Sequence, residues 1–126
     1  MKVFHFIQSS GAFHEVDNTG DTLLGVGYAG RGIGVNSPAH DGVKSVGPLP
    51  DGIYIALRAR EHQTLGPVAI PLEPSRSTAK RGRSGFYIHG DNSARNRSAS
   101  SGCIILPRHI RERIDAGSLI VVSEGV

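Results

Sequence analysis

Hydrophobic and polar residues alternate at the start of the chain, which is the pattern of a strand with one buried face. Between Val3 and Ile7 the odd positions share one face, and Phe4 and Phe6 share the other. Turn-forming residues follow, and residues 13–16 are predicted to pair back onto this first strand. The pattern therefore predicts a β-hairpin whose phenylalanines face a core.

Similar short apolar segments recur along the chain, and turn-forming residues separate them. Runs rich in β-branched and aromatic residues predict strands. These runs cover residues 22–28, 53–58, 68–72, 86–89 and 118–122. One helix is expected between Pro107 and Gly117, because proline suits a first helical position and two isoleucines lie four residues apart. The pattern indicates a mainly β fold with one short helix.

Composition and charge favour one β-rich domain over residues 1–126. Glycine (17) and proline (7) are frequent among the 126 residues, and 38% of the chain is hydrophobic. The net charge is +3, and basic residues cluster at positions 76–83 and 95–97. Such clusters can bind anionic polymers, but no aromatic residue lies between Leu72 and Gly85 to stack on a base. We therefore interpret residues 74–84 as a mobile, solvated loop and expect no nucleic-acid partner.

Cysteine and histidine counts exclude several kinds of site. The single Cys103 can form neither an intrachain disulfide nor a zinc site of several thiolates. The six histidines show no helical His-x-x-x-His pair, so no metal or other cofactor is expected. The longest apolar runs have four residues and the first thirty residues lack a sustained apolar stretch, so we expect neither a signal peptide nor a membrane segment.

Reactive chemistry is concentrated in residues 86–92 and 98–105. A predicted strand ends on His89, and a loop of small residues delivers Cys103. A free thiol has a pKa of about 8.5, and a nearby imidazole can remove its proton to make the nucleophilic thiolate. Gly102 lets an acyl carbonyl approach closely, and backbone N–H groups at Gly102 and Cys103 are candidate oxyanion donors.

These motifs resemble a known family. His-Gly at positions 89–90 followed by Ser-Ser-Gly-Cys at positions 100–103 is similar to the YkuD-type L,D-transpeptidase signature. The likeness is closer to compact L,D-transpeptidase-like effectors of type VI secretion systems, whose signature reads His-Gly-Asp and then Ser-x-Gly-Cys-Ile. Blocks at residues 27–32, 36–38 and 46–54 extend it. The resemblance implies a single-domain twisted β-sheet or sandwich, with its short helix after the catalytic cysteine.

The resemblance also implies an activity on peptidoglycan stem tetrapeptides. Cys103 would attack the carbonyl of the third residue and expel the terminal D-alanine, with His89 as the base. Water would then give L,D-carboxypeptidase activity, a D-amino acid would give exchange, and a neighbouring stem would give a cross-link; the sequence leaves these open. The implied setting is an antibacterial effector made in the bacterial cytoplasm and active in a target cell's periplasm, with a secretion apparatus and an immunity protein as partners.

Further site residues follow from the same motifs. Tyr28 is a candidate cleft wall, and Asp91 is a candidate contact that orients the histidine or binds a substrate amine. The remaining candidates for substrate or oxyanion binding are Gly90, Ser101, Gly102 and Arg97. Two residues depart from the broader family. Ser101 replaces a histidine, and Ile105 stands where many members have arginine, which Arg31, Arg95 or Arg97 would then have to replace.

Two alternatives remain at this stage. One is a wall-binding module whose cysteine is inert. The other is a cysteine peptidase or amidase of another fold, although such enzymes usually place the nucleophile before the histidine, and here His89 precedes Cys103.

Overall fold

A computed structural model describes residues 1–94 and 96–125, and its elements are mainly short strands. The strands are β1 (Val3–Ile7), β2 (Ala12–Asp17), β3 (Gly20–Val26), β4 (Tyr28–Ala29), β5 (Gly52–Ala56), β6 (Arg60–His62), β7 (Gly66–Pro74), β8 (Tyr87–His89), β9 (Ile104–Ile105) and β10 (Leu119–Ser123). Two 3₁₀ turns, η1 (Gly32–Gly34) and η2 (Pro38–His40), and the helix α1 (Arg108–Arg111) complete the fold. No helix within these described ranges is long and apolar enough to cross a membrane.

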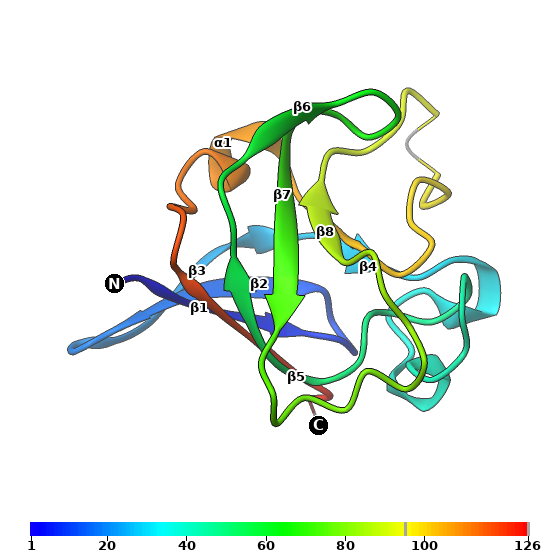
Figure 1. The fold of residues 1–126 in the computed structure, drawn as a ribbon, viewed down its shortest axis with the longest axis horizontal. Coiled ribbons are helices and arrows are strands. Elements are labelled where there is room, and N and C mark those ends of the chain that lie inside the picture. The colour runs from blue at the N-terminus through cyan, green and yellow to red at the C-terminus, as the bar shows by residue number, and fades with distance from the viewer. Residues whose placement is uncertain (95, 126) are drawn as a thin grey trace.

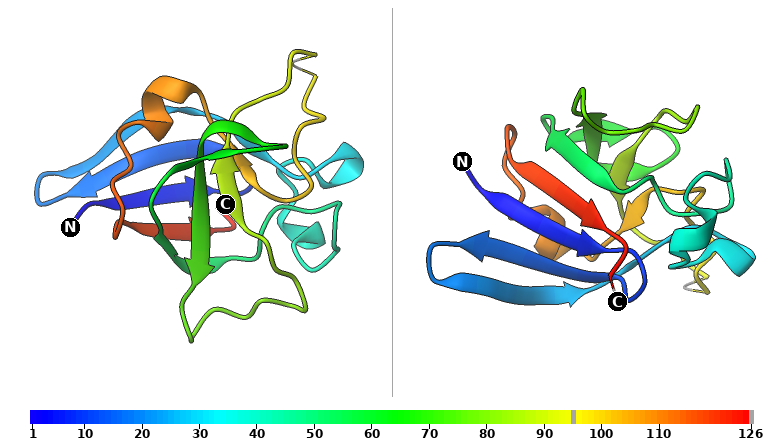
Figure 2. Two further views of the ribbon diagram at one scale, coloured as in Figure 1. Left: turned by 45° about the horizontal axis from the view of Figure 1, so that its top comes forward. Right: turned by 90° about the horizontal axis from the view of Figure 1, so that it is seen from below.

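The strands form one twisted sheet in the order β3-β2-β1-β10-β5-β7-β8-β9-β4, with β6 paired to β7 outside this path. Most neighbours are antiparallel, but β1 pairs in parallel with β10, and β8 pairs in parallel with β9. The β2–β3 hairpin extends to one end of the molecule, and the loops that follow β4 and β8 gather at the other (Figures 1 and 2). The sheet thus separates an edge hairpin from a cluster of loops.

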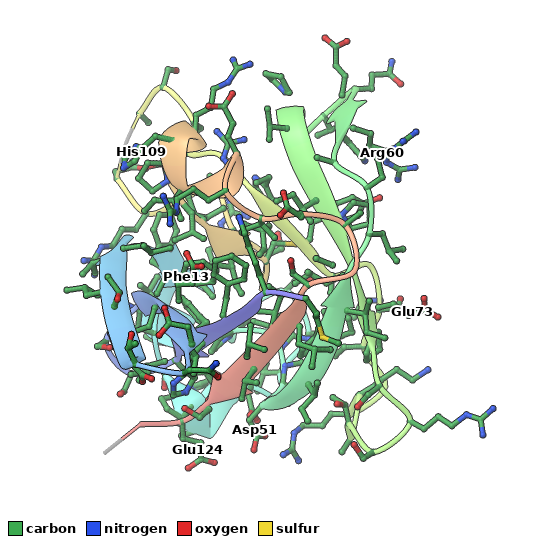
Figure 3. The ribbon with its side chains drawn as sticks, turned by 90° about the vertical axis from the view of Figure 1, so that its left-hand side faces the viewer. Phe13, Asp51, Arg60, Glu73, His109 and Glu124 are labelled. Carbon is green, nitrogen blue, oxygen red and sulfur yellow. The ribbon has the colours of Figure 1, made fainter. Side chains whose placement is uncertain are left out.

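The core lies between the strands and α1, and it confirms the alternation at the start of the chain. Phe4, Phe6 and Phe13 are fully buried, and the rings of Phe4 and Phe13 stack with their centroids 5.4 Å apart. Figure 3 shows Phe13 pointing inward, whereas the labelled Arg60 and Glu73 point away from the interior. Burial of such large apolar side chains is the main favourable contribution to folding.

The structure departs from the sequence-based elements in three places. The expected strand over residues 22–28 is divided, because β3 ends at Val26 and Tyr28–Ala29 forms β4, which pairs with β9 at the other end of the sheet order. The helix has four residues rather than extending to Gly117, because its bonds change to the i to i+3 pattern, as in Arg113 N–H to the Ile110 carbonyl at 3.0 Å. The polar strand β6 was not expected, because Arg60–His62 lacks apolar alternation and forms only by pairing with β7.

Buried Tyr54 is one of the side chains that fix the segment before β5 to the core. The Tyr54 hydroxyl donates a hydrogen bond to the Pro50 carbonyl at 2.6 Å, and the Tyr54 ring packs edge-on against Phe86. Both Tyr54 and Pro50 are buried, so neither group has access to water as a substitute partner.

We expect Tyr54→Phe to lower the free energy of unfolding by about 1–2 kcal/mol, because the ring packing remains while a buried carbonyl loses its donor. Urea denaturation measures this change. Tyr87→Phe is the matched control, since the Tyr87 hydroxyl bonds to Arg60 at the surface, and it should change stability by less than about 0.5 kcal/mol. Equal losses in the two variants would contradict a special role for the Tyr54 bond.

Candidate active site

The parallel pairing of β8 with β9 brings together the two segments that carry reactive chemistry. Ile88 lies in register with Ile104, and His89 lies in register with Ile105. The Leu106 N–H extends the pairing by donating to the His89 carbonyl at 3.1 Å. Thirteen residues lie between His89 and Cys103 in the sequence, yet His89 ends β8 and Cys103 directly precedes β9, the strand that pairs with it.

The same register sets the direction of the two side chains. Ile88 and Ile104 are both fully buried and point into the core. Because successive side chains of a strand alternate in direction, the residue after Ile88 and the residue before Ile104 project to the opposite side. These residues are His89, which ends β8, and Cys103, which directly precedes β9, so we expect the imidazole and the thiol to project to one face of the strand pair.

His89 is held by its own backbone neighbour. Its Nδ1 lies 2.9 Å from the Gly90 carbonyl oxygen, so Nδ1 carries the proton and donates. Among the described residues Nε2 has no hydrogen-bond partner. Burial lowers the pKa of His89 below its ordinary value, and the nearby Arg111 charge lowers it further, against the Gly90 bond. The structure therefore favours a neutral imidazole whose Nε2 can accept a proton.

Cys103 is partly exposed, and its sulfur lies in a mixed environment. The thiol donates to the Gly85 carbonyl at 3.7 Å, and no hydrogen bond joins it to His89 within the described part of the chain. Burial raises the pKa of the thiol, whereas the Tyr87 backbone and the Arg83 charge lower it. Because the thiol bonds to the Gly85 carbonyl, it must leave Gly85 before it can transfer its proton to His89. Catalytic hydrogen bonds often tighten in this way only when substrate binds.

Ser100 organises the loop that delivers the cysteine. Its buried hydroxyl donates to the Cys103 carbonyl at 2.6 Å and accepts from the Gly102 N–H at 2.9 Å and the Gly30 N–H at 3.0 Å. Gly102, with φ of 134°, adopts a conformation that L side chains rarely adopt, and a Cβ there would lie 2.2 Å from Arg83. The Gly102 N–H, which we expected to be an oxyanion donor, already donates to the Ser100 hydroxyl in this structure.

Arg83 corrects the interpretation of residues 74–84 as a solvated loop. Its side chain is only 6% exposed, and its guanidinium group donates to four backbone carbonyls. The acceptors are Asp41 at 2.8 Å, Pro48 at 2.7 Å, Gly47 at 3.0 Å and Ser101 at 3.2 Å. Arg83 thus ties the cysteine loop to the loop before β5. A charge count alone could not distinguish it from exposed Arg81.

Tyr28 and Asp91 meet beside a cavity of about 530 Å³. The Tyr28 hydroxyl donates to Asp91 at 2.7 Å and accepts from the Ala99 N–H at 3.1 Å. Burial and the Asp91 carboxylate raise the pKa of Tyr28 to about 12. Both residues line the cavity, but its lining within the described residues includes neither His89 nor Cys103. Asp91 forms no bond to the imidazole there, and the Gly90 carbonyl orients His89 instead.

The other expected site residues lie around this arrangement. Gly90 packs against Arg111, because a Cβ on Gly90 would lie 2.8 Å from the guanidinium group. Ser101 is exposed and contributes its carbonyl to Arg83. Arg31 and Arg97 are both exposed, and Arg95 lies outside the described residues. Within the described residues, neither Arg31 nor Arg97 forms a hydrogen bond with Cys103 or His89.

Groups that could ligate a metal gather away from the candidate active site. His5, His14 and Asp21 place one potential ligand atom each within 4.8 Å of one another. The sequence search for helical ligand spacing did not detect them, because strand pairing rather than spacing along the chain brings them together.

The Tlde1 domain matches residues 25–122 of this chain. No curated protein matches this chain. Among solved structures, an Enterococcus faecium L,D-transpeptidase superposes with a TM-score of 0.64 and 14% identity, over 97% of this chain and 49% of that one. Bdellovibrio bacteriovorus Bd1075 superposes with a TM-score of 0.63 and 15% identity, over 99% of this chain and 48% of that one. Mycobacterium tuberculosis L,D-transpeptidase 3 superposes with a TM-score of 0.56 and 20% identity, over 98% of this chain and 61% of that one.

These comparisons confirm the mainly β, YkuD-like fold and the resemblance found in the motifs. The chain spans about half the length of the first two solved structures and less than two thirds of the third. At these identities the structural likeness establishes the fold and not the reaction.

We expect the His89 imidazole to titrate below pH 6.5, because burial and the Arg111 charge both disfavour its protonated form. A depressed folded-state pKa contributes stability that is complete above pH 6.5 and is lost as the pH falls toward the folded pKa. NMR titration of the ring protons, assigned with His89→Gln, measures the midpoint. A midpoint at or above 6.5 would contradict this electrostatic description.

Arg83→Gln should slow alkylation of Cys103 by iodoacetamide at pH 7 by roughly tenfold, because a cation that favours the thiolate is lost. Arg81→Gln removes the same charge from the same loop, but Arg81 pairs with Asp41 and Asp51 near the surface, so its rate should stay within about twofold.

Arg83→Lys separates the charge from the loop contacts. It should keep most of the alkylation rate while lowering the free energy of unfolding by about 2–4 kcal/mol, since an ammonium cannot span four carbonyls. Equal alkylation rates in wild type and a folded Arg83→Gln would show that the Arg83 charge does not act on the thiol.

Proposed function

The chain belongs to the Tlde1 domain family, and from this membership we propose that it is a cysteine acyl-transferase acting on peptidoglycan stem tetrapeptides. One observation carries the proposal. The register of β8 with β9, which His89 ends and Cys103 directly precedes, supports a common face for the imidazole and the thiol. The L,D-transpeptidase fold of the solved neighbours supports peptidoglycan as the substrate class.

In the proposed reaction the neutral His89 Nε2 removes the proton of the Cys103 thiol, while Nδ1 stays bonded to the Gly90 carbonyl. The thiolate attacks the carbonyl carbon of the third stem residue, and a carbon–sulfur bond forms. The bond to the terminal D-alanine then breaks, and the departing amine takes the proton from the imidazolium. The product is a thioester on Cys103 and free D-alanine, so atoms and charges balance.

The acceptor decides which activity follows. Water gives a tripeptide and makes the protein an L,D-carboxypeptidase, whereas a free D-amino acid regenerates a tetrapeptide by exchange. His89 deprotonates either acceptor in the reverse of its first role. Both outcomes remove donor tetrapeptides or alter them, and this loss would weaken cross-linking of a bacterial wall.

We propose that the protein acts as an antibacterial effector in the periplasm of a target cell. Two findings support this setting. They are the Tlde1 domain match and the resemblance of the motifs to those of compact type VI effectors. A secretion apparatus would deliver the protein, and an immunity protein would protect the producing cell.

The inert wall-binding module remains the competing function. The fold match removes the basis for a peptidase of another fold, but it leaves open whether the thiol reacts. Cys103 is partly exposed, and a purely structural cysteine would gain nothing from that exposure.

Incubation of the purified protein with tetrapeptide muropeptides under reducing conditions should yield tripeptides, or D-amino-acid-exchanged products when a D-amino acid is added. Cys103→Ala should fold normally and lose at least about 1000-fold of this activity, because the nucleophile is removed. Thermal unfolding checks the fold, and chromatography of the muropeptides measures the products. Unchanged muropeptides with wild type, combined with wall binding that Cys103→Ala retains, would support the inert module.

A further inference from the structure

We propose that His5, His14 and Asp21 form a binding site for a divalent transition-metal ion on the outer face of the β1–β2–β3 sheet. This site is independent of the proposed acyl transfer. The three strands lie side by side at the end of the molecule where the β2–β3 hairpin projects (Figure 2). The candidate active site on β8 and β9 lies beyond β10, β5 and β7 in the sheet order.

Strand register brings the three side chains together. His5 on β1 lies directly opposite His14 on β2, and their rings meet edge to face with centroids 6.2 Å apart. On β3, Asp21 pairs with Val16, so it lies diagonally across from His14 on the same face. One potential ligand atom from each residue falls within 4.8 Å of the other two.

His14 supplies a second, independent observation. Its Nδ1 is buried and has no hydrogen-bond partner among the described residues. Buried polar atoms in folded proteins are nearly always paired, so this nitrogen has a free lone pair or proton for a ligand to satisfy. A metal ion, which accepts a lone pair, would satisfy the nitrogen once its proton is lost.

His5 has the kind of support that metal-binding imidazoles usually have. Its Nε2 lies 2.6 Å from the Ser123 hydroxyl on β10, which fixes the orientation of the ring. A histidine that binds metal through one nitrogen commonly uses the other in such a bond. This leaves Nδ1 of His5 as the nitrogen available for an ion.

The donor set selects the class of ion. Two imidazoles and one carboxylate suit Zn²⁺, Cu²⁺ or Ni²⁺ rather than Mg²⁺ or Ca²⁺, which take oxygen ligands. Ligands lie about 2.0–2.2 Å from a bound zinc ion, so the three groups must close by about 1 Å. Asp21 is exposed at the edge of the sheet, and rotation of its side chain can supply this movement. Three protein ligands also leave a coordination position open for water.

Binding would connect the edge strand β3 to β1 across β2. The hairpin would then be fixed by an ion as well as by its backbone bonds, and metal affinity would add to folding stability. At a hundredfold excess of free ion over the dissociation constant, the melting temperature should rise by roughly 10 °C.

Isothermal titration of untagged, chelator-treated protein with ZnCl₂ tests the site. We expect one ion per chain. His14→Gln and Asp21→Asn should each weaken zinc binding by at least about 10- to 100-fold. Loss of a residue that only hydrogen-bonds to a metal ligand costs this much, and loss of a ligand itself should cost no less. The Asp21 variant also guards against misfolding, because that side chain is exposed. His109→Gln, at an exposed position on α1, is the matched control and should bind zinc as wild type does.

Cys103→Ala separates this site from the proposed active site, and it should keep full zinc affinity. Absence of a saturable zinc isotherm up to millimolar concentration would overturn the metal site. Loss of binding in Cys103→Ala, or equal binding by wild type, His14→Gln and Asp21→Asn, would also overturn it. None of these results bears on muropeptide cleavage, so failure of the metal site and failure of the acyl transfer are distinguishable.

Discussion

The parallel register between β8 and β9 is the constraint on which the candidate active site depends. Fully buried Ile88 and Ile104 fix it, because a slip of β9 by one residue would turn Ile104 out of the core. The same slip would turn Cys103 into the core and away from His89. The burial of Ile88 and Ile104 thus determines where the thiol and the imidazole project, although neither isoleucine takes part in the proposed reaction.

Two buried arginines act on the candidate active site, one on each reactive residue. Arg83 bonds to four backbone carbonyls and lowers the pKa of Cys103, while Arg111 bonds to the carbonyls of Leu106, Pro67 and Val68 and lowers the pKa of His89. Neither guanidinium group pairs with a carboxylate within the described ranges. Burying these two cations costs free energy, which the charges of Asp41 near Arg83 and Glu112 near Arg111 offset only in part. The Arg83 field opposes the burial that raises the pKa of the Cys103 thiol, and the Arg111 field favours the neutral imidazole that can accept the thiol proton.

The sequence predicted most of the strands because alternation and burial agree. Phe4 and Phe6 are buried as expected, and the expected runs recur as β5, β7, β8 and β10. The sequence-based prediction failed where contacts between distant segments determine burial or strand formation. Nothing local distinguishes buried Arg83 from exposed Arg81, and the polar strand β6 exists only through β7. Cross-strand groupings such as His5 with His14 also leave no trace in spacing along the chain.

Intact-protein mass spectrometry during turnover tests the acyl transfer most directly. Protein mixed with a stem tetrapeptide and quenched in acid should carry an added tripeptide acyl group, and peptide mapping should place it on Cys103. Tripeptide formation with no adduct on Cys103, undiminished in Cys103→Ser, would contradict a thioester intermediate.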